Sequence, residues 1–252
     1  MFLRKESMLM MLISHPVLRF PLIVLLLAFA WWTGKTGLAG LYSFQANSYL
    51  ELWQHQRMIN PEYTITNTKY QKLRQQHKHI LSLTHYNGDY WTSFAQMQLW
   101  YLYNTPQLTP TQQAQFKQDI LAAYRTAISL RPTWPYTFAD FAIAKANFGE
   151  YDTEFVDALH KANQLGARES YVIHTTLELG LTVWNQLPLS SQKVVANAVE
   201  RSVTWQLNEQ LNQKERIFAL SLVGFYQKLP EVCALMTTIG QQKANCPTTK
   251  PS

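Results

Sequence analysis

Hydrophobic residues recur at every third or fourth position along most of the chain, a spacing typical of amphipathic α-helices. The chain has no sustained alternation of apolar and polar residues of the kind that indicates β-strands. One stretch has no periodicity, because Leu22–Trp32 is apolar at every position. The pattern therefore predicts an all-α protein with one strongly apolar segment near the N-terminus.

The apolar run has the flanks of a membrane-spanning helix. Arg19 precedes it and Lys35 follows it, each eight residues from its midpoint. At ~1.5 Å per residue, each charge lies about 12 Å from the midpoint, so the long side chains can reach headgroups about 15 Å away. Trp31 and Trp32 suit the aromatic belt at the far interface. We therefore expect a transmembrane anchor over residues 17–40.

The basic residues around the run predict its orientation. Arg4, Lys5 and Arg19 precede it, whereas only Lys35 follows closely. Positive charge is retained on the cytoplasmic side of membranes. Residues 1–16 are therefore expected in the cytoplasm and the main part of the chain across the membrane.

A cleavable signal peptide is the alternative interpretation of the same segment. Its apolar core would have an ordinary length, and Gly37-Leu38-Ala39 supplies small residues where cleavage would occur. The flanking charges and tryptophans favour the uncleaved anchor. Both interpretations export the rest of the chain.

Beyond the anchor we expect a helical domain over residues 41–240 and a flexible C-terminal tail over 241–252. The apolar stripe of the first helix is predicted at Leu41, Phe44, Ser48 or Tyr49, and Leu52 or Trp53. The stripe of the next helix is predicted at Tyr70, Leu73, His77, Ile80 and Leu81.

Two capping boxes mark predicted helix starts. In the first, Thr109 is followed by a proline and then by Gln112 at the third helical position. In the second, Asn212 is followed by Glu215. We expect a helix to begin at each.

Composition narrows the classes of function. Hydrophobic residues make up 47% of the chain and charged residues 15%, which excludes a disordered protein. Lys and Arg number 22 against 16 Asp and Glu, for a net charge of +6, but they are scattered singly. Nucleic acid is therefore not an expected partner.

The two cysteines, Cys233 and Cys246, lack the C-x-x-C spacing of zinc and redox sites. In an exported domain they are candidates for one disulfide near the C-terminus. Unpaired thiols are the alternative.

The chain has no recognisable catalytic motif, and neither a cofactor nor a metal is expected. His77, His79 and His85 are close in sequence, but the first two point about 200° apart on a helix, which does not suit a metal. Two further groups fit structural roles better than chemistry. The acidic group suits a helix cap and first turn: Glu150, Asp152, Glu154 and Asp157. The aromatic group suits core packing better than sugar stacking: Trp53, Trp91, Trp100 and Trp134.

Part of the chain resembles the tetratricopeptide repeat. The end-of-repeat signature is similar to Tyr124-x-x-Ala127-x-x-x-x-Pro132, the mid-repeat turn to Gly149-Glu150-Tyr151-Asp152, and the first-helix pattern to Phe138, Phe141 and Ala142. The match covers about residues 120–165. Lys145 departs from it, standing where a tyrosine is usual, and so does Ala167 in place of the next proline. The resemblance implies a solenoid of helical hairpins, with a partner groove lined by the first helix at Phe138, Phe141, Lys145 and Asn147.

The wider arrangement resembles the VpsP-type proteins of bacterial exopolysaccharide biosynthesis. The features that match are a short basic start, one membrane helix, a Tyr49-x-x-x-Trp53 segment and degenerate repeat helices. This resemblance implies a single-pass protein of the bacterial inner membrane with its main domain in the periplasm. Its implied partners are other membrane proteins of a polysaccharide assembly pathway.

We therefore expect a non-catalytic scaffold that acts through protein–protein interactions. One alternative is a glycan-binding or glycan-processing protein that uses the aromatic residues. Another is an assembly factor of a different envelope machine, such as a pilus or a secretion system.

Overall fold

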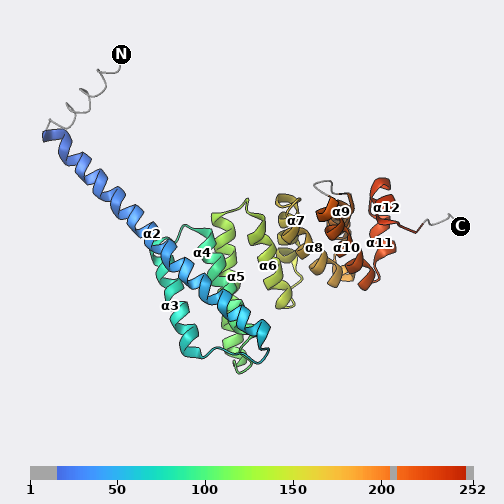
Figure 1. The fold of residues 1–252 in the computed structure, drawn as a ribbon, viewed down its shortest axis with the longest axis horizontal. Coiled ribbons are helices and arrows are strands. Elements are labelled where there is room, and N and C mark those ends of the chain that lie inside the picture. The colour runs from blue at the N-terminus through green and yellow to red at the C-terminus, as the bar shows by residue number, and fades with distance from the viewer. Residues whose placement is uncertain (1–15, 205–208, 248–252) are drawn as a thin grey trace, which may run out of the picture. The chain divides into compact units, whose positions relative to one another are not determined.

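The computed structural model describes residues 16–204 and 209–247 (Figure 1). Over these residues the protein is all-helical, as predicted, with eleven α-helices, one 3-10 helix and no strand. The elements in chain order are α2 (Pro16–Ile59), α3 (Asn67–Leu83), α4 (Gly88–Tyr103), α5 (Pro110–Leu130), α6 (Pro135–Asn147), α7 (Thr153–Leu165), α8 (Ser170–Thr182), η1 (Trp184–Gln186), α9 (Leu189–Thr204), α10 (Glu209–Phe225), α11 (Leu229–Ala234) and α12 (Thr238–Ala244). Contacts divide the chain within α4 into two compact units, Met1–Ser93 and Phe94–Ser252.

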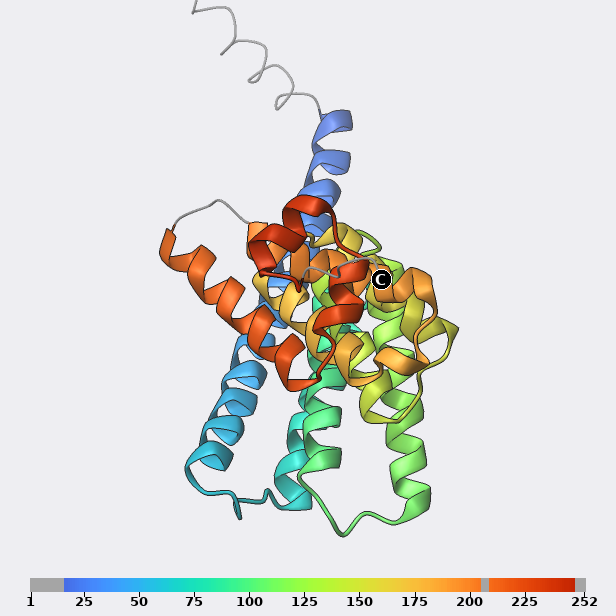
Figure 2. The same ribbon diagram turned by 90° about the vertical axis from the view of Figure 1, so that its right-hand side faces the viewer.

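The first unit is built on α2, an unbroken helix of 44 residues that pairs with α3 over its C-terminal half (Figures 1 and 2). Its section Arg19–Ile59 contains a window long and apolar enough to cross a membrane, and almost none of that window is buried. Packing begins where the apolar run has ended. The residues that then face the interior are Ala39, Ala46, Leu50 and Trp53.

The predicted stripe on this part of α2 is wrong except at Trp53. Leu41 is 65% exposed, Phe44 73% and Leu52 50%, and Tyr49 is also exposed. The buried side of α2 instead begins with the small residues Ala39 and Ala46. Small side chains let two helix backbones approach closely, whereas a face of Leu and Phe holds them apart.

The stripe predicted for α3 is confirmed. Thr66 caps the helix by accepting a hydrogen bond from the backbone N–H of Lys69. The buried residues of the helix are Tyr70, Leu73, His77, Ile80 and Leu81.

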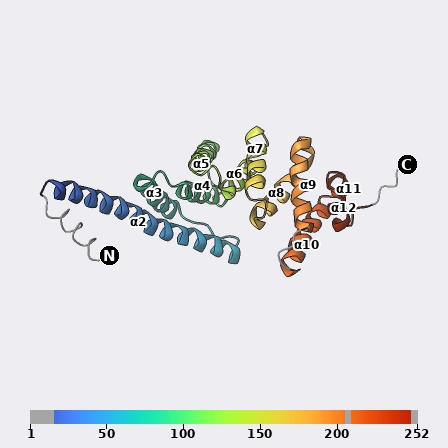
Figure 3. The ribbon, with the colours of Figure 1, turned by 90° about the horizontal axis from the view of Figure 1, so that it is seen from above.

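In the second unit, α5 to α9 follow one another in space in the order of the chain (Figures 1 and 3). α6 packs against α5, α7 and α8, and α9 packs against α7, α8, α10, α11 and α12. The capping box at Thr109 and Gln112 is present and starts α5 as predicted. The turn after α6 needs Gly149, whose φ of +68° is a conformation that side chains with a Cβ disfavour.

α8 and α9 approach closely at Gly180. A Cβ added there would lie 2.2 Å from a methyl group of Val195, so only glycine fits without a shift of the neighbouring helix. The second predicted capping box is wrong. α10 is already helical at Glu209, before Asn212, and Glu215 accepts a hydrogen bond from His174 on α8 instead.

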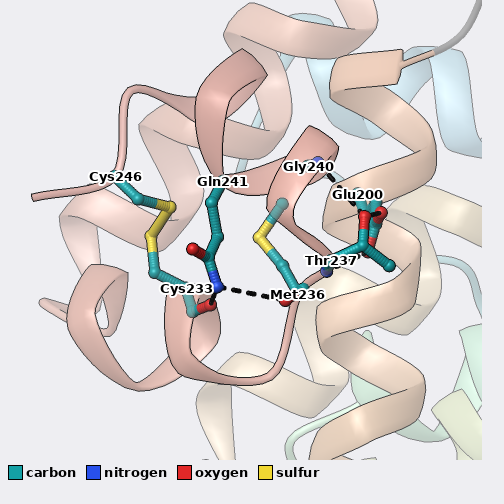
Figure 4. Close-up of a disulfide and its surroundings, with 7 residues drawn as sticks. All are labelled: Glu200, Cys233, Met236, Thr237, Gly240, Gln241 and Cys246. Atoms are coloured by element: carbon teal, nitrogen blue, oxygen red, sulfur yellow. Dashed lines mark hydrogen bonds between the residues drawn. A yellow bond between two sulfur atoms is a disulfide. The ribbon is translucent and has the colours of Figure 1, made fainter. Parts of the chain in front are cut away.

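The predicted flexible tail over 241–252 is corrected for its first seven residues. α12 extends to Ala244, and Cys246 forms a disulfide with Cys233 (Figure 4). The segment is also attached to α9, because the backbone N–H and the hydroxyl of Thr237 both donate to the Glu200 carboxylate. Residues 248–252 of the predicted tail lie outside the described residues, as do residues 1–15 of the predicted cytoplasmic segment.

Candidate functional site

The structure places the predicted groove residues mostly in the interior. Phe138, Phe141 and Lys145 are buried in α6, and only Asn147, at the end of the helix, is exposed. The helices on several sides of α6 enclose its large side chains. The expectation that these three residues line an open groove is therefore wrong.

Lys145 is the centre of an ion-pair cluster at the turn between α6 and α7. Its side chain is 1% exposed, and Nζ donates to Asp152 and Glu154 at 2.8 Å each. The Glu150 carboxylate lies 3.1 Å from the same nitrogen. Outer cations complete the cluster: Lys117 pairs with Glu150 at 2.5 Å, and Arg125 makes two hydrogen bonds to Glu154 at 2.6 and 2.8 Å.

The cations hold all three carboxyl groups in the charged form. The hydrogen bond from Arg125 is the main reason that the pKa of Glu154 falls to about 2, with Lys145 adding to it. The hydrogen bond from Lys117 is likewise the main cause of the lowered pKa of Glu150. Burial opposes ionisation of Asp152, but hydrogen bonds from Lys145 and the backbone lower its pKa.

Burial alone would lower the pKa of the Lys145 ammonium. Its hydrogen bonds to Asp152, Glu154 and Glu150 outweigh burial, and the net effect is a raised pKa. No group in the cluster is therefore poised to exchange a proton near neutral pH. The arrangement fixes the α6–α7 turn, and Asp152 also caps α7 as predicted.

A second polar group surrounds Asp140, which is buried in α6. Its carboxylate accepts hydrogen bonds from Gln96 at 2.9 Å and from the Tyr171 hydroxyl at 2.5 Å. Burial raises the pKa of this carboxyl more than the two hydrogen bonds lower it. The ring of Tyr171 stacks on Tyr136, and Tyr136 contacts Trp134. These contacts tie the starts of α6 and α8 together.

The four tryptophans that are candidates for sugar stacking differ in their exposure to solvent. Trp53 is buried, Trp91 and Trp100 are half-buried, and Trp134 is 42% exposed under the guanidinium of Arg131. Trp91 donates its indole N–H to the backbone carbonyl of His85 at 2.8 Å. Core packing therefore accounts for Trp53, and Trp134 is the most accessible of the four.

His77, in the middle of the histidine cluster's helix, has two polar contacts. His77 is buried, with Nδ1 3.1 Å from the Leu73 carbonyl oxygen and Nε2 3.2 Å from the Ser93 hydroxyl. Burial lowers its pKa, so the neutral form is favoured. Within the described residues, no three His, Cys, Asp or Glu side chains are arranged to hold a metal ion.

One exposed apolar surface lies on α2, where the predicted anchor ends. Leu38 is 41% exposed, Leu41 65% and Phe44 73%, and the three share one side of the helix. This side is continuous with the apolar run, so the apolar face of α2 extends past Lys35. A second apolar surface lies on α10, where Ile217 is 57% and Phe225 77% exposed. Large exposed apolar patches mark interaction surfaces in many proteins.

Leu41 and Phe44 of this face were predicted from the sequence to point to the interior. The sequence did not indicate the neighbouring pocket of about 300 Å³, between α2 and α3. The pocket is lined by aromatic rings and by Lys69 and Lys72, which are exposed on α3. The only sequence signal for it was the Tyr49-x-x-x-Trp53 segment, which supplies one wall.

Over residues 16–204 and 209–247 the protein is all-helical, with one helix near the N-terminus long and apolar enough to cross a membrane. No protein-family model matches the chain, and no curated protein matches it significantly.

Proposed function

We propose that this protein is a membrane-anchored, outward-facing scaffold that binds another membrane protein of an exopolysaccharide assembly pathway. The observation that carries the proposal is the apolar face of α2, which includes Leu38 near the end of the anchor and continues beyond it through Leu41 and Phe44. This face continues directly from the membrane-spanning part of α2. We therefore expect the partner to cover it with a helix that leaves the membrane alongside α2. The shared bilayer confines both proteins to one plane and raises their effective concentration.

The anchored, outward-facing topology has three supports. Arg4, Lys5 and Arg19 precede the apolar run and only Lys35 follows it closely, which favours a cytoplasmic N-terminus. The Cys233–Cys246 disulfide suits an oxidising compartment such as the periplasm. Ala39, the last residue of the alternative cleavage site, is fully buried within unbroken α2, which favours the uncleaved anchor.

Tetratricopeptide-type organisation is supported by the packing of four helices. α6 pairs with α7 and also contacts α8, while α7 also contacts α9, as in consecutive hairpins of a solenoid. Ala127, Ala142 and Ala162, the small residues of the resemblance, are all buried. The assignment to exopolysaccharide assembly rests on the resemblance to the VpsP-type proteins.

A photo-crosslinking amino acid in place of Phe44, in the full-length protein in native membranes, tests the proposal. The matched control carries it in place of Gln75, which is exposed on α3. We expect an adduct from position 44 with a polymerase, glycosyltransferase or export component, and none from position 75. An adduct from position 44 with a pilus or secretion component would overturn the pathway but keep the scaffold. The absence of adducts from both positions would overturn the proposal that the apolar face of α2 binds a partner.

Crosslinking from Phe225 separates the two apolar surfaces of the protein. If the α2 face binds the partner, position 225 on α10 gives no adduct with the protein captured from position 44. Capture from position 225 alone would move the partner surface to α10.

A second candidate function, glycan binding, is favoured by the pocket between α2 and α3.

A further inference from the structure

The pocket between α2 and α3 combines aromatic walls with two cationic side chains. Tyr49 and Trp53 come from α2, Tyr63 from the connecting turn, and Lys69, Lys72 and Gln76 from α3. Its volume of about 300 Å³ is at the lower end of the range for small-molecule sites, which suits one or two sugar rings.

The charge in the pocket has one sign. Lys69 and Lys72 form no ion pair with any carboxylate of the described residues, and no carboxylate lines the pocket. Elsewhere in the protein, buried Lys145 is surrounded by acidic partners. Two ammonium groups without protein partners favour an anionic ligand.

The walls are held in place by hydrogen bonds within the first unit. Arg57 donates to the backbone carbonyl of Tyr63 at 2.9 Å, which fixes the turn that carries this ring. Gln76 donates from Nε2 to the Tyr42 carbonyl and to Gln45 Oε1, each at 3.0 Å. Its amide oxygen remains an acceptor for a ligand hydroxyl. A site ordered before binding loses less conformational entropy when the ligand arrives.

The position of the pocket along α2 decides between two sources of anionic ligand. Tyr49 is 17 residues beyond Trp32, at the end of the apolar run, which is about 25 Å along a helix. A lipid headgroup at the membrane surface does not reach that far. The ligand is therefore a molecule outside the bilayer.

We propose that this pocket binds an acidic saccharide, with a uronate carboxylate held by Lys69 and Lys72 and a sugar ring against Tyr49 or Tyr63. Sugar rings present C–H faces that pack on aromatic rings and hydroxyl groups that bond to phenol and amide groups. An acidic peptide satisfies the lysines but makes no comparable use of the aromatic walls. Saccharide binding in the pocket and partner binding on the apolar face of α2 are independent, because neither requires the other.

Calorimetric titration of the full-length protein in phosphatidylcholine nanodiscs tests the proposal, because sugar-based detergents would compete for the pocket. The probe is trigalacturonate. Two comparison ligands separate its properties: trimethyl trigalacturonate has the same rings without charge, and a triglutamate peptide has the charge without the rings. We expect saturable binding of trigalacturonate, and binding of the other two at least about tenfold weaker.

Variants assign the binding to the pocket. Lys69→Gln with Lys72→Gln is expected to weaken trigalacturonate binding at least about tenfold, since two charge contacts are lost. Lys78→Gln is the matched control, because Lys78 is exposed on the opposite side of α3, and it is expected to leave affinity unchanged. Tyr49→Ala, at a ring that is 41% exposed, is expected to weaken binding without unfolding the unit.

Three outcomes would overturn the inference. One is the lack of saturable trigalacturonate binding up to about 1 mM. Another is equal weakening by Lys78→Gln and the double variant, which would indicate non-specific attraction. The third is tighter binding of triglutamate, which would assign the pocket to a protein partner. Each is distinguishable from failure of the scaffold proposal, which is decided by crosslinking from position 44.

Discussion

Replacing Lys145 with methionine tests the role assigned to the cluster at the α6–α7 turn. Methionine keeps most of the side-chain volume in a site that is 1% exposed, while it removes the charge. Asp152, Glu154 and Glu150 then lose a shared cation. Lys117 and Arg125 still pair with two of these carboxylates.

The expected cost follows from the exposure of the partners. Glu150, Asp152 and Glu154 are 28%, 53% and 38% exposed, so solvent screens each contact. At about 0.5–1 kcal/mol for each screened contact, the three together contribute about 2 kcal/mol. The hydrogen bond from Arg125, which is the larger cause of the low pKa of Glu154, remains after the substitution. We expect Lys145→Met to lower the free energy of unfolding by about 2 kcal/mol at pH 7.

The cost should depend on pH with a definite sign. Lowered carboxyl pKa values stabilise the folded state above the unfolded-state pKa of about 4, and that contribution is lost as the pH falls toward the folded value. For Glu154 the folded pKa is about 2. Near pH 2, Lys145 is left buried among neutral carboxyl groups, which is unfavourable. The difference between wild type and Lys145→Met should therefore shrink between pH 5 and pH 2.

Urea unfolding of the full-length protein in detergent, followed by circular dichroism at pH 7, 5 and 3, measures this difference. Lys161→Met, at an exposed position of α7, is the control and should change stability by less than about 0.5 kcal/mol. A loss by Lys145→Met no larger than that of the control at pH 7 would refute the assignment. So would a loss of the same size at pH 3.

Three further predictions concern stability and use the same unfolding measurement. Gly180→Ala should destabilise the protein by about 1–2 kcal/mol, because the added Cβ collides with Val195 of α9. Gly224→Ala, in open space, is the control and should be neutral or stabilise by up to about 1 kcal/mol. Equal effects of the two substitutions would refute the close approach of α8 and α9. Gln98→Met should stabilise the protein by about 1 kcal/mol, since the buried amide of Gln98 has no hydrogen-bond partner in the described structure. A loss of stability would indicate that the amide is hydrogen-bonded. Cys233→Ser with Cys246→Ser should cost about 3 kcal/mol, and dithiothreitol should destabilise the wild type but not this variant.

The sequence predicted local features of the fold well. The Thr109 capping box, the Asp152 cap and the buried stripe of α3 each depend on residues within a few turns of one helix. The stripe of α2 was wrong because hydrophobicity does not decide which side of a helix is packed. The buried side of α2 carries Ala39, Ala46, Leu50 and Trp53, while Leu41 and Phe44 are exposed.

The candidate site was harder to predict than the fold. A lysine at the end of a predicted helix suggests solvent exposure, and nothing local shows that Lys145 is buried. Asp152 and Glu154 were correctly related to the start of α7, whereas Glu150 lies in the turn before it. The contact of these residues with Lys145 depends on the turn at Gly149. The pocket was missed because its two walls lie on different helices. The register between α2 and α3 decides that Tyr49 faces Lys69 and Lys72 across one cavity.

In the proposed anchored topology, the unbroken helix α2 connects the membrane-spanning segment to the pocket with a fixed helical register. Each residue of an α-helix advances the chain by ~1.5 Å and turns it by about 100°. One alanine inserted between Lys35 and Leu38 would barely change the distance of the pocket from the membrane, yet it would turn the pocket by more than a quarter of a revolution. Seven inserted residues would lift the pocket by about 10 Å and restore nearly the original direction. In the proposed anchored topology, the rotation of α2 within the bilayer would therefore determine the direction in which the pocket faces.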